Sequence, residues 1–252
     1  MNRLKPFPLR LSTLPRERPF RVSVVVPFAP RETEGELLLQ RLHTWLRNAE
    51  IVLVRVNGCT LPVEVSNCED STSVHVVASP PGRARQMNVG AHAARGQWLW
   101  FLRADSHIFA RTSAALEAFI ERGDAALGYF DLRYRDDGPA LMWLNALGAN
   151  LCARWLGLPF GDQGFVLPAS WFERLGGYNE GAAYGEDHLL VRRAHAAGLP
   201  LRRVGAPLAS SARKYAKHGW WRTTAWHLVL TVHQAWRQWW ALRHDHRQAR
   251  TT

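Results

Sequence analysis

Apolar residues in the first half of the chain alternate between continuous runs and helical faces. Runs at 22–27, 51–56 and 74–78 are rich in β-branched and apolar residues and predict strands. Between the first two runs, residues 37–49 place leucine and tryptophan on one face of a predicted helix. The alternation continues from residue 21 to about 105. It predicts an α/β fold with a mostly parallel central sheet, right-handed crossovers and flanking helices.

The stretch 82–106 supplies the helix and the strand at the centre of this pattern. Small and apolar residues recur at helical spacing over 83–95, and Gly96 ends the predicted helix. Residues 98–102 are then wholly apolar, which is typical of a strand in the middle of a covered sheet.

Charged residues at both ends of this stretch indicate a ligand site. Arg83 and Arg85 lie in the first helical turn, where cations oppose the helix dipole and therefore favour an anion nearby. Asp105 follows the predicted strand, and open α/β sheets bind ligands at the carboxyl ends of their strands. Capping of the next helix is the alternative role for this aspartate.

The second half of the chain has a mixed pattern. The predicted elements are a helix capped by Thr112 with Leu116, Phe119 and Ile120 inward, strands at 125–134, 165–167 and 201–204, and helices at 139–156 and 186–197. We expect this half to extend the sheet and to return polar loops towards the first half.

Composition narrows the class of protein. The 252 residues are 47% hydrophobic and 21% charged, which indicates a globular chain rather than a disordered one. The net charge of +11 comes almost wholly from arginine, since Lys5, Lys214 and Lys217 are the only lysines. A basic balance of this kind is compatible with nucleic acid, anionic lipid or a phosphorylated substrate.

Several other classes are disfavoured. Cys59, Cys68 and Cys152 are odd in number and lack metal-type spacing, which predicts a reducing compartment without a disulfide framework or a zinc site. The histidines show no HExxH spacing, and the chain contains no dinucleotide or P-loop glycine motif. Residues 1–20 are expected to be a flexible lead-in without a signal sequence, and no apolar run is long enough to span a membrane.

A set of specific motifs carries a family resemblance. The block Gly82-Arg83-Ala84-Arg85-Gln86-Met87-Asn88 continues through Gly90, Ala91 and Ala94-Arg95-Gly96, and later come Phe101 to Asp105, Gly161-Asp162-Gln163, Gly176-Gly177-Tyr178, Glu186-Asp187 and Arg213-Lys214. In this order, over roughly residues 21–222, the chain resembles the family 2 glycosyltransferases. It is most similar to a small bacterial branch with a GRARQMNxGAxxARG block.

The resemblance implies an A-type glycosyltransferase fold, which binds nucleotide sugars, over residues 21–218. It implies transfer of a sugar from a nucleotide-sugar donor to an acceptor hydroxyl, with inversion and assisted by Mg²⁺ or Mn²⁺. The implied donor contacts are Pro27, Glu32, Asn57, Arg83, Arg85, Asn88, Arg103, Asp105 and Arg213.

This sequence departs from the family pattern at two of these positions. Asn57 stands where the family has an aspartate for the nucleobase, and Arg103 stands where the first acid of an Asp-x-Asp-like motif is expected. Asp105 is therefore the one implied metal ligand. The guanidinium of Arg103 can bind two phosphate oxygens with parallel hydrogen bonds, and its charge could partly replace that of the divalent metal ion.

The remaining motifs are assigned to the acceptor. The resemblance implies that Asp162 and Gln163 lie on the acceptor side, and that Asp187 is the catalytic base, with Glu186 as the competing candidate. An inverting transfer needs such a base, together with cations that neutralise the leaving diphosphate. Without the resemblance, an Asx-type turn and helix N-terminal electrostatics explain these two acidic pairs.

Two other classes of function stay open. A chain that lacks one acid of the metal motif could bind a nucleoside diphosphate without catalysis. Residues 219–252 hold six of the twelve tryptophans among arginines, which predicts a long helix packed on the domain or on an anionic membrane surface. The same basic aromatic segment could form a nucleic-acid platform, but the buried α/β pattern and the specific family block make that the weaker alternative. The expected location is the cytoplasm, with the membrane's inner face as the docking surface.

Overall fold

The computed structural model describes residues 18–30, 32–63, 72–182, 185–221 and 224. The predicted lead-in over 1–20 and the predicted C-terminal helix over 219–252 lie almost wholly outside these residues. Within them, no helix has the length and hydropathy that a membrane crossing requires.

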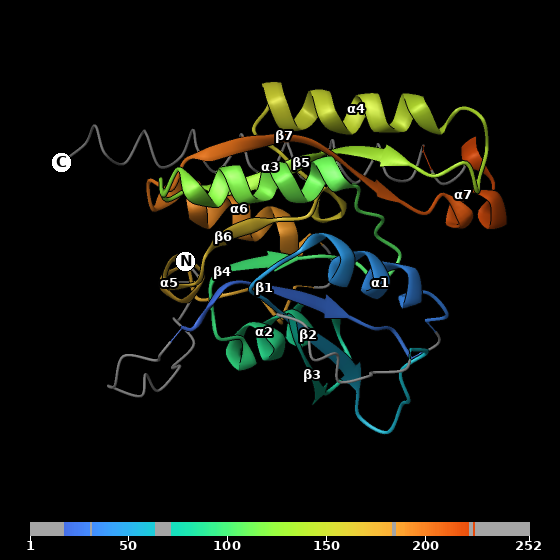
Figure 1. Ribbon diagram of the computed structural model, residues 1–252. Helices are drawn as coiled ribbons and strands as arrows, with labels where there is room; N and C mark the ends of the chain where they lie inside the picture. The colour runs from blue at the N-terminus through green and yellow to red at the C-terminus, as the bar shows by residue number, and fades with distance from the viewer. Residues whose placement is uncertain (1–17, 31, 64–71, 183–184, 222–223, 225–252) are drawn as a thin grey trace. The chain divides into compact units, whose positions relative to one another are not determined.

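The strands form one seven-stranded sheet in the order β3-β2-β1-β4-β6-β5-β7 (Figure 1). The strands are β1 Phe20–Pro27, β2 Ala49–Val56, β3 Thr72–Ser79, β4 Gly96–Phe101, β5 Leu127–Tyr134, β6 Val166–Pro168 and β7 Leu201–Ser210. Strands β1 to β4 are parallel to one another, whereas β6 is antiparallel to β4 and to β5. The predicted α/β fold, with a parallel first half and a mixed second half, is confirmed.

Helices alternate with these strands as the apolar spacing predicts. They are α1 Glu36–Trp45, α2 Arg83–Ala93, α3 Ala110–Glu121, α4 Met142–Trp155, α5 Ala169–Arg174, α6 Glu186–Ala196 and α7 Arg213–His218, with the 3₁₀ turn η1 at Gly161–Gln163. Gly198 follows α6 with a φ of 76°, as a glycine after a helix end commonly does.

Two predicted helix boundaries are wrong. The first helix ends before Ala49, because Asn48 turns the chain with a φ of 50° and Ala49 already belongs to β2. Thr112 is not the N-cap of α3. Phe109 has that position, and the hydroxyl of Thr112 accepts a hydrogen bond from the Phe109 amide at 3.0 Å, three residues inside the helix.

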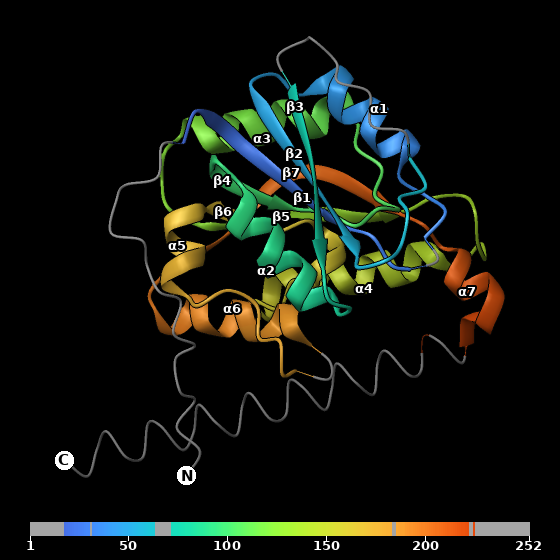
Figure 2. The same ribbon diagram turned by 90° about the horizontal axis from the view of Figure 1, so that it is seen from below.

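The core has two layers, one on each face of the sheet. Alternate strand residues such as Val24 and Trp100 pack against α1 and α3, and their neighbours Val25 and Phe101 pack against α2, α5 and α6. Figure 2 shows the two groups of helices on opposite sides of the strands. This period-two alternation is the geometric consequence of successive side chains pointing to opposite faces.

Helix α4 exposes its apolar face. Leu147 and Leu151 are 48% and 43% exposed, and Trp155 is 81% exposed, although their spacing predicts one helical face. The buried positions of this helix in its part from residue 146 on are smaller, Ala146 and Ala153, whereas Met142 at its start is also buried. Small side chains let a helix approach its support closely, so the large ones are left on the outer side.

The chain divides into two compact units. The first, Met1–Arg133 with Ala146–Ser210, contains the sheet and its flanking helices. The second, Tyr134–Asn145 with Ser211–Thr252, has a small core of Met142, Ala212 and Tyr215. Within it, Asp137 accepts hydrogen bonds from the Ser211 hydroxyl at 2.8 Å and from the Ala212 amide at 2.7 Å.

A buried carboxylate ties three strands together at their amino ends. Glu50 of β2 is fully buried and accepts hydrogen bonds from the amide and the Nε of Arg95, at 2.6 Å and 2.9 Å, and from the hydroxyl of Ser23. That hydroxyl in turn accepts from the amide of Gly96 at 2.7 Å. A Cβ on Gly96 would lie 2.4 Å from the Ser23 amide nitrogen, so only glycine allows this close packing.

We expect Glu50→Ala to lower the free energy of unfolding by about 2–4 kcal/mol, because it leaves the Ser23 hydroxyl and the Arg95 amide without their acceptor and removes the ion pair of the half-exposed Arg95 guanidinium. Urea denaturation measures this change. The matched control is Glu121→Ala, which removes only an exposed ion pair with Arg21 and should cost about 1 kcal/mol or less. A loss of similar size in both variants would contradict this account of the network.

Candidate active site at the carboxyl edge of the sheet

The first unit gathers charged residues where its central strands end. Arg103 and Asp105 follow β4, and Arg83 begins α2. Asp162 lies in η1 and Asp187 in the first turn of α6. Because the amide of Phe101 donates to the carbonyl of Phe165 at 2.8 Å, the segment carrying η1 is held beside the end of β4.

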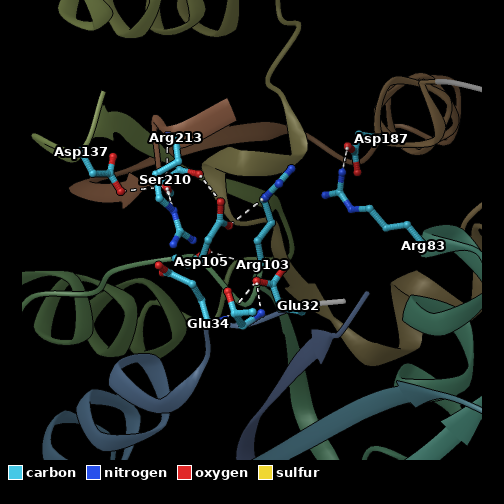
Figure 3. A network of polar contacts seen from close by, with 12 residues as sticks. Glu32, Glu34, Arg83, Arg103, Asp105, Asp137, Asp187, Ser210 and Arg213 are labelled. Carbon is cyan, nitrogen blue, oxygen red and sulfur yellow. Dashed lines mark hydrogen bonds and ion pairs between the residues drawn. The ribbon is translucent and has the colours of Figure 1, made fainter. Parts of the chain in front are cut away.

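Arg83 and Asp187 face each other at the N-terminal end of α6 (Figure 3). Arg83 Nη1 lies 3.4 Å from Asp187 Oδ2 and 3.6 Å from Glu186 Oε1. Gly161 packs directly against this pair, because a Cβ there would come within 2.0 Å of Asp187 Oδ2 and 2.6 Å of Arg83 Nη2. The glycine of the Gly-Asp-Gln motif is therefore required for the carboxylate and guanidinium to sit against the η1 backbone.

Arg103 and Asp105 form a second ion pair. Arg103 Nε lies 3.0 Å from Asp105 Oδ1, and the hydroxyl of Ser210 donates to Asp105 Oδ2 at 3.4 Å, as Figure 3 shows. Desolvation lowers the pKa of the Arg103 guanidinium, but the charges of Asp105, Asp162 and Asp187 outweigh it and raise that pKa overall. The guanidinium is thus held charged beside three carboxylates.

Several buried polar atoms in this cluster have no hydrogen-bond partner among the described residues. They are Asp162 Oδ1, Asp187 Oδ1, Arg83 Nε and His188 Nδ1. Burial raises the pKa of Asp162, opposed by the charges of Arg103 and Arg83, and burial lowers the pKa of His188. Unpaired buried polar groups are costly, so their concentration here indicates groups that a ligand would satisfy.

Other predicted donor residues have contacts elsewhere in the first unit. Arg85 Nε lies 3.1 Å from Glu180 Oε2, and Asn88 Nδ2 donates to Glu180 Oε1 and to the Tyr178 carbonyl, both at 2.9 Å. Glu32 Oε1 accepts from the Thr33 and Glu34 amides at 3.0 Å and 3.1 Å. These contacts order loops around the site, and a direct donor role for the three residues stays a prediction.

The remaining predicted residues have distinct positions. Pro27 ends β1, and Asn57 is exposed directly after β2. Arg213 begins α7 in the second unit, where its Nε donates to the Ser211 hydroxyl at 3.1 Å.

Gln163 is fully buried and holds η1 in place. Its Nε2 donates to the Phe130 carbonyl at 3.0 Å, and its Oε1 accepts from the Phe160 amide at 2.9 Å. Asn150 also accepts from this Nε2, at 3.3 Å. The contacts make Gln163 a positioning residue for Asp162. The acceptor contact implied by the resemblance stays a prediction.

The sequence analysis did not identify Gln86 and Ser210 as site residues. The buried Gln86 Nε2 donates to the Phe28 carbonyl at 2.8 Å and to the Val54 carbonyl at 2.9 Å, which joins the carboxyl ends of β1 and β2. Gln86 lies inside the Gly82–Gly96 block, so the motif contained a signal for it. No motif marks Ser210.

The predicted metal ligand set is incomplete in the described part of the chain. No three histidine, cysteine or acidic side chains there are placed to hold a metal ion. Asp105 has one oxygen against Arg103 and the other against Ser210. A cation and a guanidinium compete for the same carboxylate, so these residues as arranged do not fit a divalent ion.

No protein-family model and no curated protein sequence matches the chain. Solved structures do match it. Residues 1–349 of Staphylococcus aureus TarS in complex with UDP are 16% identical, with a TM-score of 0.52, over 76% of this chain and 60% of that one. The mannosyltransferase PcManGT of Pyrobaculum calidifontis, in complex with GDP-Man and Mn²⁺, is 18% identical, with a TM-score of 0.59, over 89% and 67%.

These likenesses confirm the predicted glycosyltransferase-type α/β fold. The chain spans about three fifths of the TarS fragment, since it covers 60% of it, whether that fragment is free or bound to UDP. The bound nucleotides and the Mn²⁺ belong to those proteins.

We expect Asp162→Asn to raise the free energy of unfolding at pH 7, by about 0.5–2 kcal/mol, a range common for stabilising substitutions. The reason is that the pKa of Asp162 is raised in the fold, so the folded state resists its ionisation. The wild type therefore loses stability relative to the variant as pH rises from the ordinary aspartate pKa, about 3.9, through the raised one. Below that window the difference should vanish.

Urea unfolding at several pH values between 4 and 8 measures the difference. Asp124→Asn is the control, because Asp124 is an exposed partner of Arg202 and should give no such pH-dependent gain. An Asp162→Asn variant less stable than the wild type at pH 7 would show that the charged form is favoured by the fold.

Proposed function

We propose that this protein is an inverting glycosyltransferase that moves a sugar from a nucleotide-sugar donor to an acceptor hydroxyl, with Asp187 as the base. One observation carries the proposal: Asp187 Oδ1 is buried and has no hydrogen-bond partner among the described residues, at the edge of the sheet where Arg83, Arg103 and Asp162 converge. The likeness in fold to a mannosyltransferase supports it.

Asp187 has the environment that a base requires. Its Oδ2 lies 3.4 Å from Arg83 Nη1, and this ion pair orients the carboxylate. Its Oδ1 is left to accept the proton of an acceptor hydroxyl. Glu186 lies farther from Arg83, at 3.6 Å, and successive helical residues point about 100° apart, so one of the two faces the acceptor.

The transfer then proceeds in one displacement. The acceptor oxygen attacks the anomeric carbon as its proton passes to Asp187 Oδ1. The bond between the anomeric carbon and the diphosphate oxygen breaks, and its electron pair stays on the diphosphate. The charge that develops there needs a cation in place, and Arg103 follows β4 at the edge where ligands of such sheets bind.

The ends of β1 and β2 are the proposed site of the nucleobase. Pro27 and the exposed Asn57 lie there, and Gln86 ties the two strands together. Glu32, Arg85, Asn88 and Arg213 are proposed to assist on the donor side, as the resemblance implies. UDP-GlcNAc in TarS and GDP-Man in PcManGT illustrate the donor class.

A divalent cation is a finer part of the resemblance. PcManGT was solved with Mn²⁺, which makes such an ion plausible for a protein of this fold. When bound, Mg²⁺ or Mn²⁺ would neutralise the leaving diphosphate. The arrangement around Asp105 does not fit the ion, so no step above depends on it.

The Asp187→Asn variant is expected to bind UDP or GDP like the wild type and to lose about 10²–10⁴-fold in transfer rate, the usual contribution of a general base. A screen of nucleotide sugars for donor hydrolysis first identifies a substrate, and the rate is then measured with it. Glu186→Gln is the matched control and should retain most of the rate. Turnover by Asp187→Asn at the wild-type rate would exclude this base.

If the folded wild type binds a nucleoside diphosphate but transfers no sugar from any donor, the result would favour the alternative of a nucleotide-binding protein without catalysis. Tight, salt-dependent binding to nucleic acid without nucleotide affinity would favour a basic binding module instead.

We also propose that residues 219–252 attach the protein to an anionic membrane surface on the cytoplasmic side, because the sequence there combines tryptophan with arginine. Removal of the residues after Arg222 should abolish co-sedimentation with vesicles that contain phosphatidylserine. Vesicles of phosphatidylcholine alone are the control and should bind weakly in both cases. Unchanged binding after truncation would show that this segment has another role.

A further inference from the structure

We infer that the guanidinium of Arg103 binds the donor diphosphate in place of a divalent cation, and that Asp105 positions this guanidinium instead of binding a metal. The inference rests on the proposed function and specifies how its site recognises the leaving group.

Arg103 presents a prepared phosphate-binding fork. Its Nε is fixed at 3.0 Å from Asp105 Oδ1, and this is the one hydrogen bond that its guanidinium makes within the described residues. The two terminal nitrogens are therefore open to a ligand. The side chain is 43% exposed, whereas that of Asp105 is 14% exposed, so the cation rather than the acid faces incoming solute. A planar guanidinium with two parallel donors matches two phosphate oxygens.

Asp105 is engaged on both of its oxygens. Arg103 contacts Oδ1, and the hydroxyl of Ser210 contacts Oδ2 at 3.4 Å. A metal ion on this carboxylate would have to displace the guanidinium or share the carboxylate with it, against the repulsion of two cations. The same contacts suit a carboxylate that holds an arginine in one orientation.

The neighbouring carboxylates explain why a cation is kept at this point. Asp162 and Asp187 interact with Arg103, and the Asp187 side chain is only 12% exposed. Without Arg103 an incoming diphosphate would meet three acids offset by Arg83 alone. With it, a solvent-accessible positive charge offsets these acids, and they in turn hold it in the charged state.

The test is the binding of UDP and GDP to the full-length protein, measured by calorimetry in EDTA and again in Mn²⁺. The wild type should bind with nearly the same Kd in both buffers. Arg103→Ala should weaken binding by about 10- to 100-fold in both, which corresponds to the loss of charged hydrogen bonds. Asp105→Asn should weaken binding less, because the guanidinium stays.

Arg103→Asp is the sharpest variant, because it restores an acid pair around Ala104. Its binding of UDP or GDP should be lost in EDTA and regained in Mn²⁺, with a matching rise in Tm on addition of Mn²⁺ and nucleotide. Arg47→Asp is the charge-matched control. Arg47 is exposed just before β2, at the opposite edge of the sheet, and its variant should behave like the wild type.

The outcomes separate this inference from the proposed function. Wild-type binding that requires Mn²⁺, or Arg103→Ala binding that is unchanged, would overturn the role of Arg103 and leave the glycosyltransferase proposal intact. Absence of binding to every common nucleoside diphosphate by folded wild type, in both buffers, would overturn the proposed function itself. If Arg103→Asp fails to fold, Arg103→Gln replaces it and should lose binding in both buffers.

Discussion

The compensation of buried carboxylates by two guanidinium groups is the constraint on which this site depends. Asp162 and Asp187 lie at the carboxyl edge of the sheet, close enough for their negative charges to repel each other in the absence of a nearby cation. Arg83 in α2 contacts Asp187, and the charge of Arg103, after β4, acts on both acids. Because a buried charge without a partner costs several kcal/mol, both arginines stabilise the fold as well as preparing it for an anion.

The backbone around the cluster is shaped by the same requirement. Gly161 lets η1 touch Asp187, and Gln163 fastens that turn to the carbonyl of Phe130. Gln86 in α2 donates hydrogen bonds to backbone carbonyls at the ends of β1 and β2. These bonds fix the position of α2 and therefore of Arg83 at its start. Uncharged amides thus determine the positions of the charged groups, and a change in either glutamine should act on the site without touching a ligand.

Periodicity was sufficient for the parallel half of the fold, because long apolar runs, with amphipathic helices between β1 and β2 and between β3 and β4, leave few alternatives. It was not sufficient for α5 and η1, which have six and three residues and therefore show no repeating pattern. Motif spacing placed Asp105 after β4 and Asp187 at the start of α6. It could not foresee that Arg85 and Asn88 contact Glu180, since that contact depends on how a distant loop returns.

The pairing of β4 with β6 has a consequence for biosynthesis. One edge of β4 pairs with β1, which is synthesised before it. The other edge pairs with β6, and its residues Val166–Pro168 leave the ribosome much later than β4. At about 5–20 residues per second, the apolar edge of Trp98, Leu99 and Trp100 stays open for several seconds on each nascent chain. An unpaired apolar strand recruits other strands. The yield of this protein in a cell therefore depends on how quickly translation passes from β4 to β6, and on whether a chaperone shields that edge meanwhile.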